Sequence, residues 1–164
     1  MTSMAKWSLL IGFFLLSACK YSLSGFDVNA ETAVVKYFQN QAPIQSADLS
    51  QVFTNKLEQR IIRETPVRLV QSNGEIEFSG TITNYTIRPL AVAADDRTQQ
   101  SELTLTVQVE YKNSKDEDLN FRESFRASEQ FDANADLTSI EEELLDSITD
   151  QLVAAIFNRA FANW

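Results

Sequence analysis

The chain has 164 residues, with 23 Asp and Glu against 14 Lys and Arg, a formal charge of −9, one cysteine and no histidine. The missing histidine removes the commonest general base and metal ligand, which excludes most hydrolase schemes. The negative charge disfavours nucleic acid as a partner.

The N-terminus has the three parts of a secretory signal. Lys6 precedes an apolar run that ends in Leu16-Ser17-Ala18-Cys19, a lipobox. The run is shorter than the roughly 20 apolar residues that span a bilayer, so residues 1–18 are predicted to be a signal peptide that is removed. The thiol of Cys19 would then carry the lipid anchor, unless the cysteine is incidental in an ordinary signal peptide. We expect residues 19–30 to be a lipidated tether and residues 31–164 to form a single domain.

Three elements are predicted after the tether. Residues 33–38 are predicted to form the first strand, because Val34, Val35, Tyr37 and Phe38 are residues that favour β-structure. Over 47–64 apolar residues recur at three- and four-residue steps, which predicts a helix with one buried face, capped by Ser46 or Asp48. Pro66 ends it, because proline has no backbone donor. Residues 67–71 are predicted to be the second strand.

Two long alternating stretches follow. Asn73-Gly74 predicts a tight hairpin from the second strand into a third, residues 76–87. The apolar phase of this strand slips near Asn84, which predicts a bulge. A polar connection, residues 90–100, leads to the fourth strand, residues 103–111.

A charged turn, residues 113–118, leads to the last predicted strand, residues 119–126. Asp116, Asp118 and Asn120 imitate the opening of a calcium loop. The loop lacks the glycine and the glutamate that such a site needs, since Phe121 and Ala127 stand there. We therefore expect a solvated turn and no metal site.

The chain ends in a predicted helix that begins between Asp136 and Ser139. Ser139 and Glu142 have the spacing of a capping box. The helix dipole favours negative charge in the first turn, so we interpret the carboxylates of Glu141, Glu142 and Glu143 as structural. Residues 152–157 are all apolar. This half of the helix either packs between the sheet and the first helix or contacts a partner or a membrane. The predicted core stripe is Ile140, Leu144, Ile148, Leu152 and Ile156.

These elements predict an α+β fold in the order β-α-β-β-β-β-α. Two amphipathic helices would pack on one face of a four- to five-stranded, mostly antiparallel sheet, which makes a two-layer sandwich. The other face would be polar and open to water or to a polar partner. Its predicted residues are Thr81, Thr83, Thr104, Thr106, Gln108, Arg122, Ser124 and Arg126.

Basic residues recur on the first helix and on the strands. They form either an anion-binding patch or a scatter of surface charges. The candidate ligand-binding residues are Lys56, Arg60, Arg63, Arg88, Arg122 and Arg126.

Several segments of the mature chain, in order, resemble one family. The segments are Tyr21-Ser-Leu-Ser-Gly25, Tyr37-Phe-Gln-Asn-Gln-Ala-Pro43, Leu49-Ser-Gln-Val-Phe53, Gly80-Thr-Ile-Thr-Asn-Tyr85, and the ending from Ile156 to Ala162-Asn163-Trp164. With the lipobox, they are similar to the LptE-like lipopolysaccharide-assembly lipoproteins. The resemblance implies two helices against a sheet, an outer-membrane lipoprotein on the periplasmic side, and a large LptD-type barrel as partner.

The resemblance also raises lipopolysaccharide as a ligand, although the acidic balance of this chain argues against direct binding of its phosphates. Lys20 after Cys19 favours sorting to the outer membrane. The principal hypothesis is a non-catalytic subunit that assists the assembly of the barrel and plugs it, with no cofactor beyond the lipid on Cys19. The alternative is a free-standing lipoprotein that binds an amphiphile or a cell-wall component. An enzyme is unsupported, because no nucleophile and base can be named.

Overall fold

The computed structural model describes residues 29–43, 48–90 and 99–162. The predicted signal peptide, Cys19 and most of the tether lie outside these residues, as do Ser46 and most of the 90–100 connection. The elements are β1 (Thr32–Val35), β2 (Gln39–Asn40), α2 (Leu49–Glu64), β3 (Arg68–Leu69), β4 (Ile76–Pro89), β5 (Gln100–Asn113), a 3-10 turn η2 (Glu117–Leu119), β6 (Phe121–Asp132) and α3 (Leu137–Phe161).

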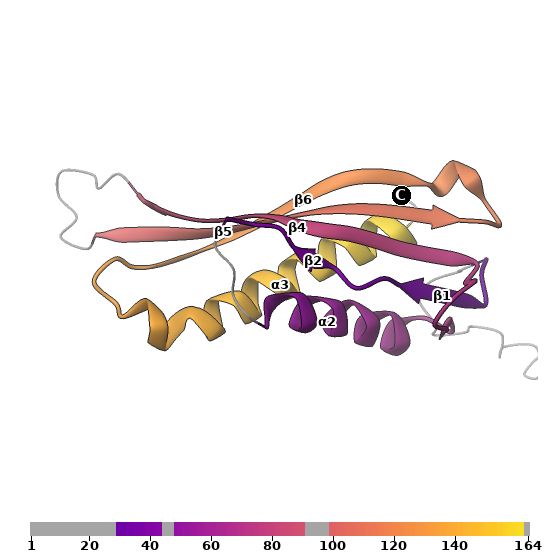
Figure 1. The fold of residues 1–164 in the computed structure, drawn as a ribbon, viewed down its shortest axis with the longest axis horizontal. Coiled ribbons are helices and arrows are strands. Elements are labelled where there is room, and N and C mark those ends of the chain that lie inside the picture. The colour runs from indigo at the N-terminus through magenta and orange to yellow at the C-terminus, as the bar shows by residue number, and fades with distance from the viewer. Residues whose placement is uncertain (1–28, 44–47, 91–98, 163–164) are drawn as a thin grey trace, which may run out of the picture.

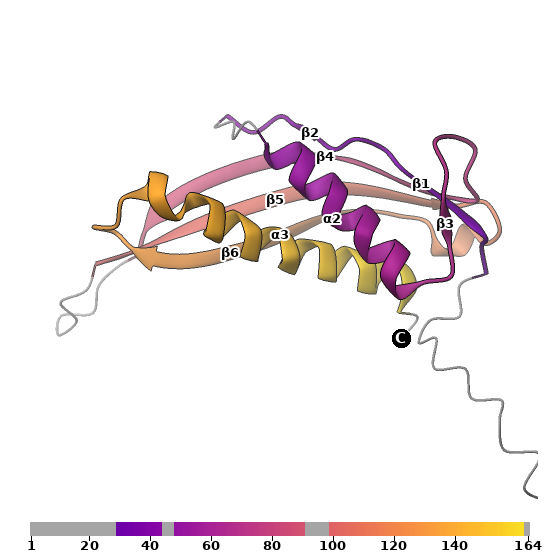
Figure 2. The same ribbon diagram turned by 90° about the horizontal axis from the view of Figure 1, so that it is seen from below.

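The elements form two layers, as the sequence predicts. The strand order is β3-β1-β4-β5-β6, and β2 pairs with β4 beyond the end of β1. Both helices lie on one face of this sheet, and none of the described residues forms a helix over the other face (Figures 1 and 2). The predicted two-layer α+β sandwich is confirmed.

The short strands pair differently from the prediction. β1 lies between β3 and β4 and is parallel to both, so β3 and β4 do not form a hairpin. The helix α2 provides the crossover that parallel strands need. Asn73 does adopt the left-handed conformation expected of an Asn-Gly turn, with φ 56°. β3 and β4 nevertheless run in the same direction, and β1 occupies the position beside β4 that the hairpin prediction assigned to the second strand.

The long strands follow the predicted alternation and extend further than predicted. β4, β5 and β6 are antiparallel neighbours, and β5 pairs with β6 without interruption from Gln100 to Tyr111. The register of β4 shifts between Ile82 and Asn84, which confirms the predicted bulge. The extra residue keeps Ile82 and Tyr85 on the same face, because a shift of one residue reverses side-chain direction.

The core lies between the helices and the inner face of the sheet. Phe53, Leu57 and Ile61 of α2 are fully buried, as are alternate residues of β4 and β5. In α3 the buried residues include Leu152, Val153, Ile156, Phe157, Ala160 and Phe161. The apolar C-terminal half of α3 is therefore part of the core, between sheet and first helix. Trp164 lies outside the described residues.

The ends of the helices are set by local hydrogen bonds. α3 begins after Asp136, whose side chain accepts a hydrogen bond from the backbone N–H of Thr138 at 3.1 Å. The predicted capping box at Ser139 is therefore wrong: Asp136 supplies the cap, and the Ser139 hydroxyl donates back to the Asp136 carbonyl. Asp48 precedes α2 but makes no side-chain cap.

Candidate functional site

The broadest candidate surface is the polar side of the sheet, which we call the outer face. Its side chains come from β4, β5 and β6 at the positions that alternate with the core, and cross-strand pairing aligns them in rows. From one end to the other the rows are Ser79, Glu110 and Arg122; Thr81, Gln108 and Ser124; Asn84, Thr106 and Arg126; Thr86, Thr104 and Ser128; and Arg88, Glu102 and Gln130.

The prediction of this face from alternation is largely confirmed. Thr83 is the extra residue at the bulge, and its hydroxyl donates to the carbonyl of Thr106 at 3.3 Å. Thr104 lies in its row but is nearly inaccessible to water, at 3 % exposure. Hydroxyl and amide side chains dominate the middle of the face, so it can exchange hydrogen bonds with a polar surface that lies flat against it.

Glu102 organises one end of the outer face. Its carboxylate accepts hydrogen bonds from Thr104 at 3.3 Å and Ser128 at 3.2 Å, and it lies 3.9 Å from the guanidinium of Arg126. Glu102 is absent from the predicted sites because the predicted strand begins at residue 103, three positions after β5 begins. Extending the alternation back to Gln100 would have found it.

Three of the six predicted basic residues lie on the outer face. Arg88, Arg122 and Arg126 are all exposed. Arg122 and Arg126 are four residues apart on one strand, which is about 13 Å, and Arg88 is a further two rows along and two strands across. These arginines are spread along the face and do not converge on one point.

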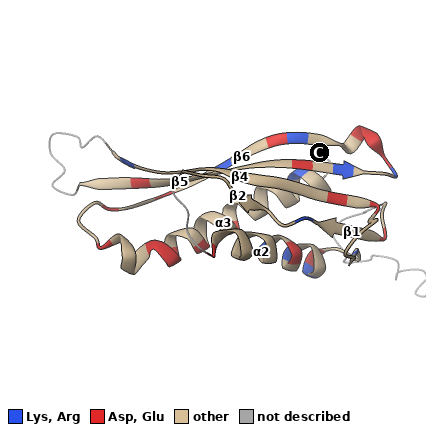
Figure 3. Ribbon diagram, in the orientation of Figure 1, with Lys and Arg blue, Asp and Glu red and all other residues tan. Residues whose placement is uncertain are grey.

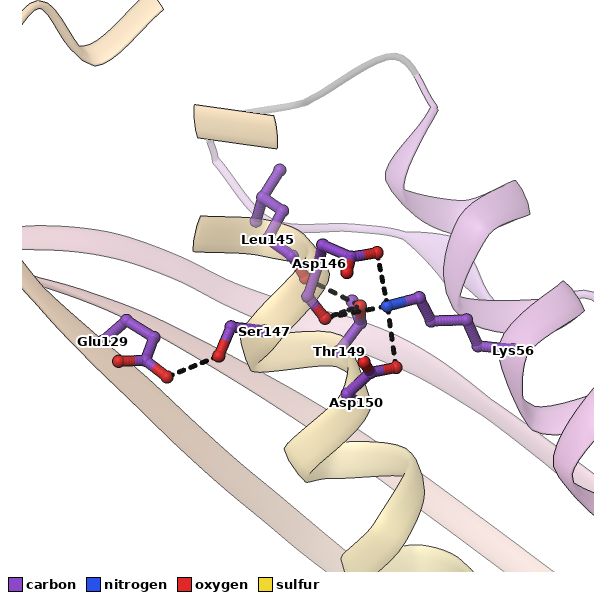
Figure 4. A network of polar contacts seen from close by, with 7 residues as sticks. All are labelled: Lys56, Glu129, Leu145, Asp146, Ser147, Thr149 and Asp150. Carbon is purple, nitrogen blue, oxygen red and sulfur yellow. Dashed lines mark hydrogen bonds and ion pairs between the residues drawn. The ribbon is translucent and has the colours of Figure 1, made fainter. Parts of the chain in front are cut away.

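The other three basic residues belong to the helix layer, on the opposite side of the molecule. Lys56 joins the two helices: its Nζ lies 2.6 Å from Oδ1 of Asp146 and 2.8 Å from Oδ1 of Asp150, and it donates to the Asp146 carbonyl at 2.8 Å. Figure 4 shows this ammonium between the side chains of α3. Lys56 is therefore engaged in holding α2 to α3.

Arg60 and Arg63 differ in their surroundings. Arg60 forms an ion pair with Glu64, Nε to Oε1 at 3.3 Å, and its guanidinium lies 5.1 Å from the ring centroid of Phe157. Arg63 is exposed in the last turn of α2. The six predicted residues thus form two groups on opposite layers, and the structure does not bring them together.

Carboxylates gather on the first half of α3, as Figure 3 shows. The Tyr85 hydroxyl donates to Glu141 at 2.7 Å, and burial of Tyr85, with the nearby carboxylate, raises the pKa of the phenol well above its ordinary value. Glu141 therefore supports the packing of α3 on β4. The predicted dipole contribution is wrong, because α3 begins at Leu137 and its first turn holds no acidic residue. Within residues 29–43, 48–90 and 99–162, no group of side chains could hold a metal ion, and no helix is long and apolar enough to cross a membrane.

The charged turn between β5 and β6 uses its own polar groups. Asp116 accepts a hydrogen bond from the backbone N–H of Asp118 at 3.2 Å, and Asn120 accepts one from that of Asn113 at 2.6 Å. These residues shape η2 and the turn around it, in line with the predicted solvated turn.

A family model described as lipopolysaccharide-assembly, LptE, matches residues 30–160, which is nearly the whole described domain. The chain belongs to the LptE family. This is a family of lipopolysaccharide-assembly lipoproteins associated with the outer membrane. No curated protein sequence matches the chain.

Solved structures share the fold of this LptE-family chain at low sequence identity. The hypothetical protein CT253 of Chlamydia trachomatis superposes with a TM-score of 0.55 at 10 % identity, covering 82 % of this chain and 99 % of that one. The uncharacterized lipoprotein B of Nitrosomonas europaea gives 0.50 at 16 % identity, covering 85 % and 91 %. A neuraminyllactose-binding hemagglutinin homolog of Helicobacter pylori gives 0.52 at 11 %, covering 84 % and 87 %. At these identities the likeness extends to the fold alone.

Proposed function

We propose that this protein is a non-catalytic, lipid-anchored subunit that plugs an LptD-type outer-membrane barrel and assists its assembly, and so supports lipopolysaccharide insertion. Membership of the LptE family supports the assembly role. One observation supports the proposed role as a barrel plug: the outer face is broad, polar and uncovered by any described element. The interior walls of membrane barrels are also polar, so this face suits contact with such a wall.

The anchor is part of the proposal. The lipobox ends at Cys19, and two or three acyl chains on that residue would hold the domain at the periplasmic face of the outer membrane. Cys19→Ala should leave the signal peptide uncleaved or release the protein from membranes, while the domain still folds. A Cys19→Ala protein that stays firmly in the outer membrane through its own domain would contradict the anchor.

The central experiment is purification of the tagged chain from detergent extracts of its native membranes. We expect a large barrel protein to co-purify in stoichiometric amount. Repeated absence of such a partner would refute the proposed role as a barrel plug.

A matched pair of variants tests which layer meets the barrel. Gln108→Trp adds bulk at the centre of the outer face, and Gln59→Trp makes the same change at an exposed position of α2. If the outer face packs on the barrel wall, Gln108→Trp should lower the amount of barrel that co-purifies about tenfold, because overpacking opposes close contact. Gln59→Trp should leave that amount unchanged. Equal recovery with both variants would remove the outer face from the interface.

The amphiphile-binding alternative depends on the apolar C-terminal segment. Phe157 is fully buried, and Phe161 contacts the rings of Phe78 and Tyr111 in the core. Packing against the sheet therefore accounts for the apolar character of this segment, and no observation in the structure favours the alternative. A stable monomer that carries a bound lipid and no barrel would restore it.

A further inference from the structure

The last strand of the sheet has an open edge. β6 is 12 residues long and pairs with β5 along its length, from Phe121 to Asp132, without a bulge. No described strand lies on its other side (Figure 2). The opposite edge of the sheet is β3, which has only two residues. We call the uncovered side of β6 the free edge.

The direction of the backbone groups on β6 follows from one hydrogen bond. The N–H of Ala133 donates to the carbonyl of Gln99 at 2.8 Å, which continues the register of the β5–β6 pair. In an antiparallel ladder, residues that bond to the neighbour alternate with residues that point away. Odd-numbered residues of β6 therefore bond to β5, and the N–H and C=O groups of residues 122, 124, 126, 128 and 130 point to the free edge. These five residues have no described backbone partner there.

The charged side chains of β6 differ in whether they have partners within the chain: the inner carboxylates do, and the outer arginines have few or none. On the inner side, Glu123 accepts a hydrogen bond from Arg159 at 2.9 Å, and Glu129 accepts one from Ser147 at 2.6 Å. On the outer side, no ion pair forms between Arg122 and any residue that the structure describes. Arg126 is 62 % exposed and has only the 3.9 Å contact with Glu102. The free edge therefore presents two arginines that are available to a neighbour.

The inner side of β6 also keeps apolar surface beside the edge. Phe125, Ala127 and Phe131 pack against the core but are only partly buried. Edge strands that avoid pairing are often short, or carry proline, a bulge or charged side chains, or are covered by another element. β6 has no proline and no glycine, and its two inward carboxylates are bonded to α3. A further strand would satisfy the backbone groups and cover the apolar row.

We propose that the free edge of β6 binds an extended strand of a partner protein that carries acidic side chains opposite Arg122 and Arg126. Acidic residues fit because a directly opposed pair of opposite charges stabilises a sheet, while like charges destabilise it. A second copy of this chain fits less well. Its β6 carries no acidic residue on the outer side between residues 122 and 130, so two copies would bring their arginines onto one face. The free edge borders the outer face, and Arg122 and Arg126 belong to both, so the added strand would extend the polar surface that contacts the barrel in the proposed function.

The test uses the full chain in detergent and a synthetic peptide as probe. The peptide Thr-Thr-Val-Glu-Val-Thr-Lys-Glu, paired antiparallel to β6, places its glutamates opposite Arg126 and Arg122. The control peptide, Thr-Thr-Val-Lys-Val-Thr-Glu-Lys, reverses each charge. Amide hydrogen exchange followed by NMR should show residues 122, 124, 126 and 128 exchanging fast in the free chain and at least about tenfold slower with the acidic peptide. The control peptide should not slow them.

Variants separate edge pairing from general stabilisation. Ser124→Pro removes a backbone N–H that points to the free edge and keeps every hydrogen bond to β5. It should therefore abolish the protection of the amides by the acidic peptide, whereas Ser124→Ala should keep that protection. If Ser124→Pro does not fold, the double variant Arg122→Glu with Arg126→Glu should reverse the preference between the two peptides. Unchanged exchange with the acidic peptide at saturation would overturn the proposal. So would equal slowing of odd and even amides, or protection that rises with protein concentration alone and so indicates a second copy.

Discussion

Truncation of Phe161 tests whether the apolar end of α3 belongs to the core. Phe161 is 7 % exposed, and its ring centroid lies 4.8 Å from that of Phe157 and 5.9 Å from that of Phe78. Phe161→Ala removes the ring and leaves a cavity among aromatic side chains that cannot close fully. The transfer and cavity contributions together should lower the free energy of unfolding by about 3–5 kcal/mol. That is a large part of the roughly 5–15 kcal/mol that stabilises a typical domain.

The assay is urea unfolding followed by far-ultraviolet circular dichroism. Phe161→Leu keeps most of the apolar volume and should cost only about 1–2 kcal/mol. Tyr37→Ala, at an aromatic residue that is 53 % exposed, should be within about 0.5 kcal/mol of the unchanged protein. A loss below about 1 kcal/mol for Phe161→Ala would refute the assignment of this ring to the core and would revive a membrane or partner contact for the segment.

Three further changes test other parts of the structure. Gly80→Ala should lower stability by about 2 kcal/mol or more in thermal unfolding, because a Cβ there meets the backbone carbonyl of Gln108 across the sheet; an unchanged melting temperature would contradict this packing. Lys56→Met should cost about 1 kcal/mol at low salt and less at high salt, measured by urea unfolding, since the partly buried ammonium joins two exposed aspartates of α3. The backbone N–H of Glu31 lowers the pKa of Glu75, so this carboxylate stabilises the fold above its unfolded pKa and the effect is lost as pH falls. Glu75→Gln should therefore lower the urea midpoint at about pH 7 but not at about pH 3, and an equal loss at both would point to packing.

Elements with a strong period were predictable from local sequence. The helix α2 and the strands β4, β5 and β6 appear where apolar residues recur at helical or alternating steps, and even the bulge near Asn84 is visible as a slip in phase. The outer position of Arg122 and Arg126 follows from the same alternation. Periodicity sets which face a side chain occupies, and burial of one face then enforces it.

Short strands and helix caps were less predictable. Two-residue strands such as β3 have no period to detect, and their neighbours are chosen by the crossover through α2. Asp136 and Ser139 can each cap a helix, and the turn that leaves β6 decides between them in favour of Asp136. Local propensities of this size are easily overridden by tertiary packing.

By itself, the sequence determined the layers of this protein, its polar sheet face and the family to which it belongs, because each follows from the pattern of residues along short segments of the chain. Only the tertiary structure decided which charges remain available. Lys56 meets Asp150 across 94 positions of the chain, while Arg122 at the edge of the sheet has no described ion-pair partner. Ion pairing depends on distances of a few ångströms between residues far apart in sequence, and only the packed fold sets those distances.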